Sequence, residues 1–404
     1  MQVKVAVIGG GAAGIMAAIE AAKKGAKVTL LEATGRVGNK ILLTGNGKCN
    51  FSNLFMDESC YYAKDRTFVN QVFEHFSPSK SVRYFEELGM LSKDKDGYLY
   101  PLGEQASIIL DVLRMELKRQ NVTVLTDAKV VRIVKENDFF ITCEDGREFS
   151  FAKVILTTGG RSYPKTGSEG NGYKLAKKLG HHIMPTVPAL VQLVGKDDFY
   201  KIIAGVRAEG RVEIYVDGIL ENTQTGEIQF TDYGISGIPV FQLSRIAAYG
   251  LLEQKKVCIQ ADVLTTYNID ELKDMVISRR NLHKNNTLEE FLCGFSNKKL
   301  CLLAIKQAGY KATELVCDKT DDELFTMVMK LKEIIFHITD TKGYLTAQVT
   351  AGGVVMDEIE ETMQSKFVKG LYFAGEIVDV DGICGGYNLH WAFASGYVAG
   401  NHAV

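Results

Sequence analysis

The sequence predicts an α/β fold built on a parallel sheet, into which a β domain and a small helical segment are inserted. Three observations predict it. The apolar strand Val3–Ile8 runs into a glycine-rich turn and a helix, the chain between 187 and 263 alternates apolar and polar residues, and the apolar strand Leu371–Phe373 returns near the C-terminus. The two ends of the chain are therefore expected to form one domain, with the middle inserted into it.

The glycine turn after the first strand carries the pattern of a dinucleotide-binding βαβ unit. Gly9 permits a tight turn, Gly11 lets the backbone approach a pyrophosphate, and Gly14 lets the helix pack closely on the strand. Ala12 and Ala13 begin that helix, which we expect to reach about residue 24. Its N-terminus presents unpaired N–H groups and the positive end of its dipole to the phosphates.

The second strand, Val28–Leu31, ends in an acid. Glu32 follows Gly14 at close to the spacing of about 20 residues expected of the carboxylate that holds ribose hydroxyls. A carboxylate there repels a 2′-phosphate, so the pattern favours FAD or NAD. The alternative is an ordinary strand–turn–helix of an α/β core, which does not require the terminal acid.

A glycine-rich segment, residues 36–53, follows without helical or strand periodicity. Structureless stretches of this length inside a domain are usually functional. Arg36 and Lys40 are candidates to meet a pyrophosphate, and the backbone from Thr44 to Asn50 is a candidate to line a ring system. A solvated surface loop is the alternative.

The remainder of the first domain reads as alternating helices and strands. Helices are expected over 68–87, interrupted at Pro78, and over 106–120, and strands over 122–125, 128–134, 139–143 and 148–151. The apolar strand Val154–Leu156 then ends at Thr158 and Gly159. In a doubly wound sheet ligands collect at the carboxyl ends of strands, so this end is a second candidate binding edge.

The middle of the chain changes character near Pro185. Arg211–Asp217 alternates as a half-buried antiparallel strand, whereas apolar residues recur with helical spacing from Ile269 to about His337. We therefore expect an FAD-binding domain over 1–186 and 345–404, a β domain over 187–268 and 338–344, and a helical insert over 269–337.

The C-terminal segment supplies a third strand end, at Gly375 and Glu376, and a glycine loop that leads at Asn388 into a helix ending near residue 399. The N-terminus of this helix suits the edge of a flavin where negative charge gathers on reduction. Three strand ends and a long loop give more binding surface than a nicotinamide needs, which favours FAD. With no second G-x-G-x-x-G pattern, NAD(P)H would dock transiently.

Nine segments together resemble one protein family, the BaiN-like or aminoacetone-oxidase-like FAD-binding flavoproteins of bacteria, within the glutathione-reductase-type superfamily with two dinucleotide folds. The resemblance covers essentially the whole chain. It rests on Gly9–Gly14, Lys40–Asn53, Thr158–Gly160, Phe230–Thr231, Gly234–Gly237, Thr350–Val354, Ala374–Glu376, Asp379–Gly382 and Gly385–Leu389.

The resemblance implies a Rossmann-like FAD-binding domain with an inserted β-barrel-like domain and a small helical insert. It also implies FAD contacts at the glycine turn, at Glu32 and in the Lys40 loop. Further contacts are implied at the Val130 backbone, at Gly375 and Glu376, and at Gly386, Asn388 and Leu389. It implies no single reaction, because members act on quite different substrates.

Composition restricts the class of protein. The chain has 404 residues, 46% of them hydrophobic, and a net charge of −2, which gives no reason to expect a polyanionic partner. The eight cysteines form no C-x-x-C pair, which favours reduced thiols. We expect a cytoplasmic protein without a signal peptide or membrane span, and no metal site.

The most economical function is an FAD-dependent oxidoreductase that transfers hydride at flavin N5 to or from a small organic molecule, as an NAD(P)H-linked reductase. A flavin amine oxidase that makes peroxide is one alternative. A flavin-bound protein that modifies or binds nucleic acid is the other, supported only by Arg279, Arg280, Lys298 and Lys299 and therefore disfavoured.

No catalytic residue can be assigned from the pattern. Cys49 is a candidate redox thiol, and Tyr387 and His390 are candidate proton donors near the flavin edge. For each of them ordinary packing is the simpler interpretation.

Overall fold

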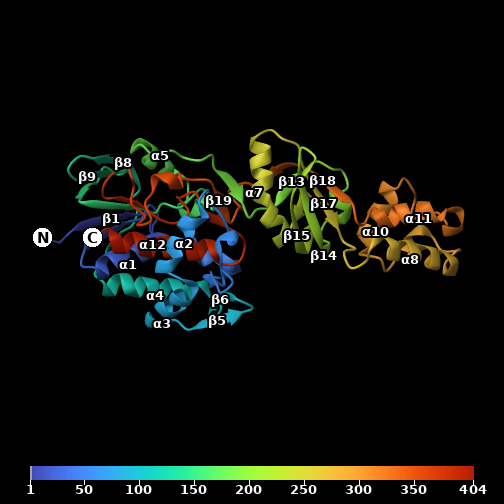
Figure 1. Ribbon diagram of the computed structural model, residues 1–404, viewed down its shortest axis with the longest axis horizontal. Helices are drawn as coiled ribbons and strands as arrows, with labels where there is room; N and C mark the ends of the chain where they lie inside the picture. The colour runs from blue at the N-terminus through green and yellow to red at the C-terminus, as the bar shows by residue number, and fades with distance from the viewer. Residues whose placement is uncertain (1) are drawn as a thin grey trace. The chain divides into compact units, whose positions relative to one another are not determined.

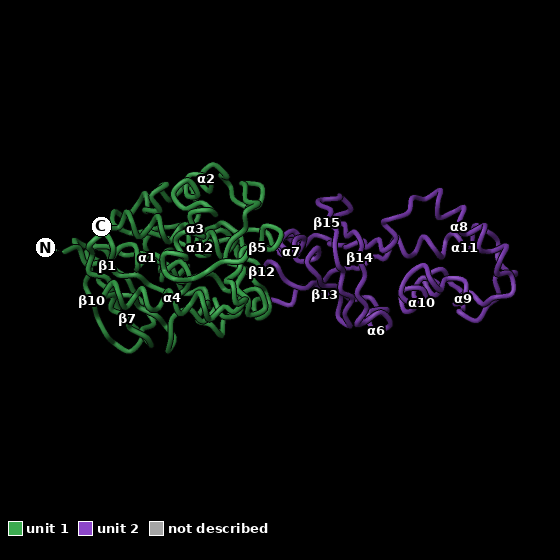
Figure 2. The backbone as a smooth tube through the Cα atoms, turned by 90° about the horizontal axis from the view of Figure 1, so that it is seen from below, with its two compact units in different colours: residues 1–188, 344–404 green, residues 189–343 purple. Residues whose placement is uncertain are grey.

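The computed structural model describes residues 2–404 (Figure 1). The chain divides into two compact units, Met1–Pro188 with Tyr344–Val404 as unit 1 and Ala189–Gly343 as unit 2 (Figure 2). Each unit has its own apolar core. The α/β fold class, with its Rossmann-like sheet, barrel and helices, is confirmed.

Unit 1 is organised around a five-stranded parallel sheet. Its strand order is β20-β11-β1-β2-β7. The strands are β1 (Lys4–Ile8), β2 (Lys27–Leu31), β7 (Thr123–Leu125), β11 (Lys153–Leu156) and β20 (Leu371–Phe373). Strands from both ends of the chain thus pair in one sheet, with Val154 opposite Leu371.

Helices α1 (Ala12–Lys23) and α12 (Tyr387–His402) pack against each other at very close range. A Cβ on Gly396 would lie 2.4 Å from the Ala13 carbonyl oxygen, and one on Gly400 would lie 2.5 Å from that of Ala17. The two glycines therefore let α12 approach the backbone of α1. Because α1 follows β1, this contact fixes the first and last parts of the chain together.

The other elements of unit 1 surround this centre. The expected break at Pro78 separates α2 (Arg66–His75) from α3 (Pro78–Glu87). The expected helix over 106–120 is α4 (Ala106–Arg119). The remaining elements are β3 (Ser52–Asn53), β4 (Tyr61–Tyr62), β5 (Ser92–Lys95), β6 (Tyr98–Pro101), β8 (Val130–Lys135), β9 (Phe139–Cys143), β10 (Glu148–Phe151), α5 (Asn171–Lys178), β19 (Val349–Ala351) and β21 (Asp381–Gly382).

The expectation of an unstructured segment over 36–53 was wrong in part. It contains the 3-10 helix Ile41–Gly47 and strand β3, which pairs with β6. Thr44, Gly45 and Asn46 depart from helical geometry inside the 3-10 helix, with φ of 55° at Gly45 and 53° at Asn46. Such short, interrupted elements leave no periodicity in the sequence.

Unit 2 contains a closed six-stranded barrel in the order β13-β16-β15-β14-β17-β18. Its strands are β13 (Leu193–Gly195), β14 (Arg207–Val216), β15 (Ile219–Phe230), β16 (Gly234–Ser236), β17 (Val257–Asp262) and β18 (Ile334–Thr341), and β12 (Val187–Ala189) precedes it. The expected alternation in β14 holds, since Val212 and Ile214 are fully buried.

Two assignments in unit 2 were wrong. Helix α7 (Ile238–Leu252) lies where only strands were expected. The helical insert was expected to reach His337, but β18 begins at Ile334 and closes the barrel against β13 and β17. The helices before it are α8 (Ile269–Leu282), α9 (Leu288–Leu292), α10 (Lys298–Gln307) and α11 (Asp321–Met329), and the short α6 (Tyr200–Ile203) belongs to the barrel segment.

Candidate functional site

A cavity of about 390 Å³ lies in unit 1 where the carboxyl ends of β1, β2, β11 and β20 meet. All but two of the residues expected to bind the cofactor line it. Those lining it are Gly9, Gly11, Ala12, Ala13, Glu32, Arg36, Lys40, Thr44, Val130, Thr158, Gly159, Gly375, Glu376, Asn388 and Leu389, and those that do not are Gly14 and Gly386.

In the glycine motif, Gly14 allows helix packing and Gly11 leaves room for a ligand. A Cβ on Gly14 would lie 1.9 Å from the Gly9 carbonyl oxygen and 2.6 Å from Thr157 Oγ1, so Gly14 serves the packing of α1 on the sheet. A Cβ on Gly11 would meet no atom within 4 Å, because Gly11 borders the cavity. No side chain caps the N-terminus of α1, so its first N–H groups are available to a phosphate.

Glu32 lies at the end of β2 with only 7% of its surface exposed. Its Oε2 accepts a hydrogen bond from Gly10 N–H at 2.7 Å, and its Oε1 accepts two from Thr34, each at 2.7 Å. These bonds fix the carboxylate at the cavity wall. Its remaining lone pairs suit the hydroxyl groups of a ribose.

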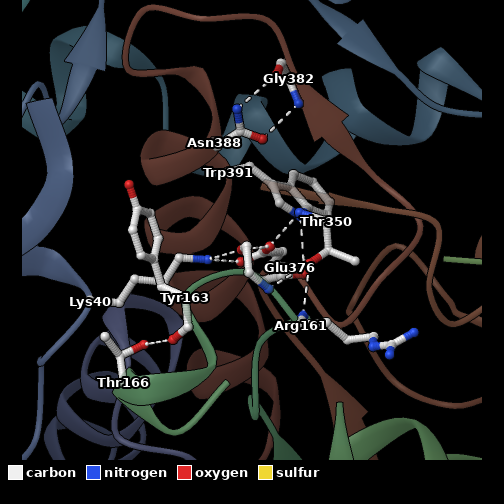
Figure 3. Close-up of polar contacts among 11 residues, drawn as sticks. Lys40, Arg161, Tyr163, Thr166, Thr350, Glu376, Gly382, Asn388 and Trp391 are labelled. Atoms are coloured by element: carbon white, nitrogen blue, oxygen red, sulfur yellow. Dashed lines mark hydrogen bonds and ion pairs between the residues drawn. The ribbon is translucent and has the colours of Figure 1, made fainter. Parts of the chain in front are cut away.

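Lys40 and Glu376, which both line the cavity, form an ion pair. Lys40 Nζ lies 2.6 Å from Glu376 Oε2 (Figure 3). Ser162 completes the group: it accepts from Lys40 Nζ at 2.5 Å and donates to Glu376 Oε1 at 2.8 Å. Thr350 N–H donates to the same oxygen at 2.6 Å. The Glu376 carboxylate thus connects its own segment with those of Lys40, Ser162 and Thr350.

The N-terminus of α12 is held rigidly at the cavity. Asn388 Oδ1 accepts from Gly382 N–H at 2.7 Å and Asn388 Nδ2 donates to the Gly382 carbonyl at 2.7 Å (Figure 3). Trp391 Nε1 donates to the Gly375 carbonyl at 3.2 Å. Gly386, the residue before the helix, has a φ of 93° and no capping side chain, so the first turn of α12 keeps its positive dipole end for a ligand.

Two polar side chains of the cavity wall have no hydrogen-bond partner within residues 2–404. These are Thr158 Oγ1 and Ser168 Oγ, and both are fully buried atoms. Buried polar atoms are nearly always paired, so their orphaned state fits a wall that a polar ligand completes. Together with the two uncapped helix N-termini and Glu32, the donor set fits the pyrophosphate, ribose and ring of FAD.

Several residues of the site escaped the sequence analysis. Ser162 bridges Lys40 and Glu376, and Asn171 Nδ2 donates to the Val130 carbonyl at 2.8 Å, which holds the backbone of β8 at the cavity. Thr34 orients Glu32. For Ser162 and Asn171 the sequence offers only a glycine-rich stretch over 161–172, whose polar side chains follow no diagnostic spacing.

The three candidate reactive side chains are all engaged in packing. Cys49 is fully buried, and burial raises the pKa of its thiol to about 12. Burial lowers the pKa of His390 to about 3; its Nε2 donates to the Phe76 carbonyl at 3.1 Å, and its Nδ1 accepts from Ser52 Oγ at 2.9 Å. Tyr387 donates to the Phe55 carbonyl at 2.8 Å, and burial raises its pKa. Their burial and hydrogen bonds agree with the simpler interpretation of ordinary packing.

Other classes of site find no support within residues 2–404. The part of the chain described contains no group of three or more His, Cys, Asp or Glu side chains arranged to hold a metal ion. Over the same residues, no helix combines the length and the apolar character that crossing a bilayer requires. None of the eight cysteines, all of which lie within these residues, forms a disulfide.

Comparison with known proteins adds independent findings. A family model described as "HI0933-like protein Rossmann domain" matches residues 3–402. The 3-dehydro-bile acid delta(4,6)-reductase of Clostridium scindens is 40% identical over 99% of both chains. The ribosomal RNA dihydrouridine synthase of Haemophilus influenzae is 29% identical over 97% of this chain and 96% of its own.

One solved structure supports the fold alone. The 3-ketosteroid delta1-dehydrogenase of Sterolibacterium denitrificans matches 99% of this chain and 98% of its own, with a TM-score of 0.52 and 13% identity. The similarity extends across the whole length. The arrangement of a nucleotide-binding sheet with an inserted region is therefore one that a known enzyme shares.

Proposed function

Since the chain belongs to the family of HI0933-like proteins and is an FAD-dependent oxidoreductase, we propose that it reduces a carbon–carbon double bond conjugated to a carbonyl group in a small steroid-like molecule. The electrons come from NADH or NADPH. The site residues named above hold the cofactor for this reaction.

The relative named as a bile-acid reductase carries this proposal, because its similarity spans 99% of both chains at 40% identity. The RNA-modifying relative adds a chemical argument. Dihydrouridine is formed by saturating the double bond of uracil that is conjugated to a ring carbonyl. Both names therefore describe one reaction type, in which the carbon remote from the carbonyl takes a hydride and its neighbour takes a proton.

FAD supplies the hydride chemistry when it is bound. The chain's own residues would bind and orient it: the uncapped N-terminus of α1 would face the pyrophosphate, and Glu32 would accept hydrogen bonds from the ribose. Lys40, held by Ser162 and paired with the Glu376 carboxylate, has a third N–H that would be available to the cofactor. The N-terminus of α12 favours negative charge on the flavin ring.

Reduction of uracil in RNA is a second candidate, favoured by the relative that is similar over 97% of this chain. The cations first associated with RNA binding give it no support. Arg280 pairs with Asp321 at 3.0 Å and Lys298 with Glu289 at 2.5 Å, while Arg279 and Lys299 donate to backbone carbonyls. Each of the four cations thus has at least one partner inside unit 2.

One experiment separates these functions. The purified holoenzyme is reduced anaerobically with NADH or with NADPH and then offered a 3-oxo-4-ene steroid acid or unmodified ribosomal RNA, and the oxidised holoenzyme, without nicotinamide, is separately offered a primary amine in air. We expect nicotinamide-dependent saturation of the steroid double bond. Peroxide formation from the amine, or dihydrouridine without steroid reduction, would replace the proposal with the corresponding alternative.

A further inference from the structure

The β5–β6 hairpin of unit 1, labelled in Figure 1, has aromatic and cationic residues at paired positions. Lys93 lies opposite Tyr100, and Lys95 lies opposite Tyr98. Residues directly opposite each other in an antiparallel pair point to the same side of the sheet, and alternate residues of a strand share a face. These four side chains therefore form one surface, named here the Lys–Tyr face.

The Lys–Tyr face adjoins the loops that bound the cavity. A Cβ on Gly385 would lie 2.9 Å from Tyr98 Cε1, and one on Gly45 would lie 3.9 Å from Tyr100 Cε1. Gly45 follows Thr44, which lines the cavity, and Gly385 lies two residues before Tyr387, where the cavity-lining helix α12 begins. The face therefore lies beside two loops next to the cavity, although none of its four residues lines the cavity itself.

The charge on this face is not balanced. Lys48, Lys93 and Lys95 converge on one carboxylate, that of Glu104, at 3.2, 2.9 and 2.6 Å. The three ammonium groups lower the pKa of Glu104 to about 2. One carboxylate cannot neutralise three ammonium groups, so a second anion would be attracted here.

The neighbouring acids do not cancel this excess on the same side. Asp94 lies opposite Leu99, whose side chain is buried, and accepts from Gly97 N–H at 2.7 Å in the hairpin turn. Asp96 lies within that turn at a φ of 50°. Neither is a partner of the three lysines within residues 2–404.

Exposed apolar surface accompanies the charge. Tyr98 is 42% exposed and Phe55 is 70% exposed. The Phe55 ring lies against the hairpin turn, since a Cβ on Gly97 would be 2.4 Å from it. An apolar area beside a cationic cluster matches a ligand with an apolar body and one anionic end.

We propose that the Lys–Tyr face, with Lys48, is the subsite for a carboxylate carried on the apolar body of the substrate. This inference rests on the proposed function and specifies which small molecules the site prefers. Tyr98 and Tyr100 contact the body, while Lys93 and Lys95 bind the carboxylate. The face spans a single short hairpin, which suits one carboxylate better than the several phosphates that an RNA-binding surface contacts.

The test uses oxidised holoenzyme and the perturbation of its flavin absorbance on binding, so it does not depend on turnover. The probes are a 3-oxo-4-ene steroid whose side chain ends in a carboxylate, and its methyl ester. We expect the wild-type protein to bind the acid about tenfold more tightly than the ester, and to lose this preference at high salt.

Variants test whether Lys93 and Lys95 cause the preference for the acid over the ester. Lys93→Met with Lys95→Met keeps the apolar stems and should abolish the preference for the acid without changing the affinity for the ester. Lys93→Arg with Lys95→Arg should retain it. Glu104→Gln, which removes the competing carboxylate, should strengthen binding of the acid by about threefold. Lys177→Met with Lys178→Met, a matched loss of two exposed charges in unit 1, should change nothing.

The inference is overturned if wild type binds acid and ester equally, if neither binds, or if the methionine pair weakens both alike. It is also overturned if single-stranded RNA binds through Lys93 and Lys95 and the acid does not. Its failure is distinct from that of the proposed function. Equal turnover of acid and ester refutes only the subsite, whereas selective binding of the acid without reduction of its double bond refutes only the reaction.

Discussion

Alanine substitutions at Gly11 and Gly14, at the start of α1, should separate cofactor binding from folding. Gly14→Ala places a Cβ 1.9 Å from the Gly9 carbonyl, so α1 must move by about 1 Å away from β1. Such overpacking costs about 1–3 kcal/mol, whereas alanine gains at most about 1 kcal/mol over glycine inside a helix. We therefore expect the apoprotein to be destabilised despite the better helix former.

Gly11→Ala is the matched change with the opposite outcome. Its Cβ meets no atom within 4 Å, and its φ of −80° suits alanine. The apoprotein should keep its stability to within about 1 kcal/mol, because the preference for glycine over alanine at an N-cap is offset by the lower entropy of alanine in the unfolded chain. The methyl group enters the space expected to hold the pyrophosphate, so FAD affinity should fall about 10- to 100-fold, or about 1.4–2.8 kcal/mol.

The assay pairs urea unfolding of both apoproteins with fluorescence titration of FAD. A Gly11→Ala protein that binds FAD as wild type does would refute the placement of the cofactor in this cavity. A Gly14→Ala protein as stable as wild type would refute the close packing of α1 on the sheet.

Three further outcomes follow from the same geometry. Glu32→Gln should weaken FAD binding about tenfold in the same titration, because the carboxylate charge that suits ribose hydroxyls is lost; unchanged affinity would remove Glu32 from the site. His390 has a folded pKa of about 3 against 6.5 in a free side chain, so the unfolded chain binds the extra proton first and stability should fall as pH drops from about 6.5 toward 3, by up to about 1.4 kcal/mol per pH unit. The same urea series on His390→Gln should show a shallower decline, and an identical decline would contradict this reasoning. Iodoacetamide should alkylate the exposed Cys293 and Cys317 in the native protein and leave Cys49 unmodified by mass spectrometry; rapid labelling of Cys49 would restore it as a reactive thiol.

The site residues that could be predicted from the sequence are those whose role depends on residues close to them in the chain. Gly9, Gly14 and Glu32 act within one strand–helix–strand unit, and each has a backbone or charge requirement that few residue types satisfy. Ser162 had no such signal. Its partners Lys40 and Glu376 lie 122 and 214 residues away, so only the folded chain brings the three together.

The errors in unit 2 have a different origin. Residues 334–338 are apolar enough to satisfy a helical or a strand period, and pairing with β13 and β17 decides for the strand, leaving Ile335 42% exposed. Helix α7 buries one side, but apolar residues such as Ile238 and Leu252 are exposed on it as well, so no apolar stripe stood out. The glycine and proline at its start, Gly237 and Pro239, were the signals available for it.

The central claim is that the cavity holds an FAD whose reduced form saturates a conjugated double bond. Its most direct measurement is a single turnover without oxygen, in which holoenzyme reduced by one equivalent of NADH or NADPH is mixed with the 3-oxo-4-ene steroid acid. The account predicts that the oxidised flavin spectrum returns in step with one equivalent of product heavier by two hydrogens. A flavin that stays reduced in the presence of the steroid would contradict it.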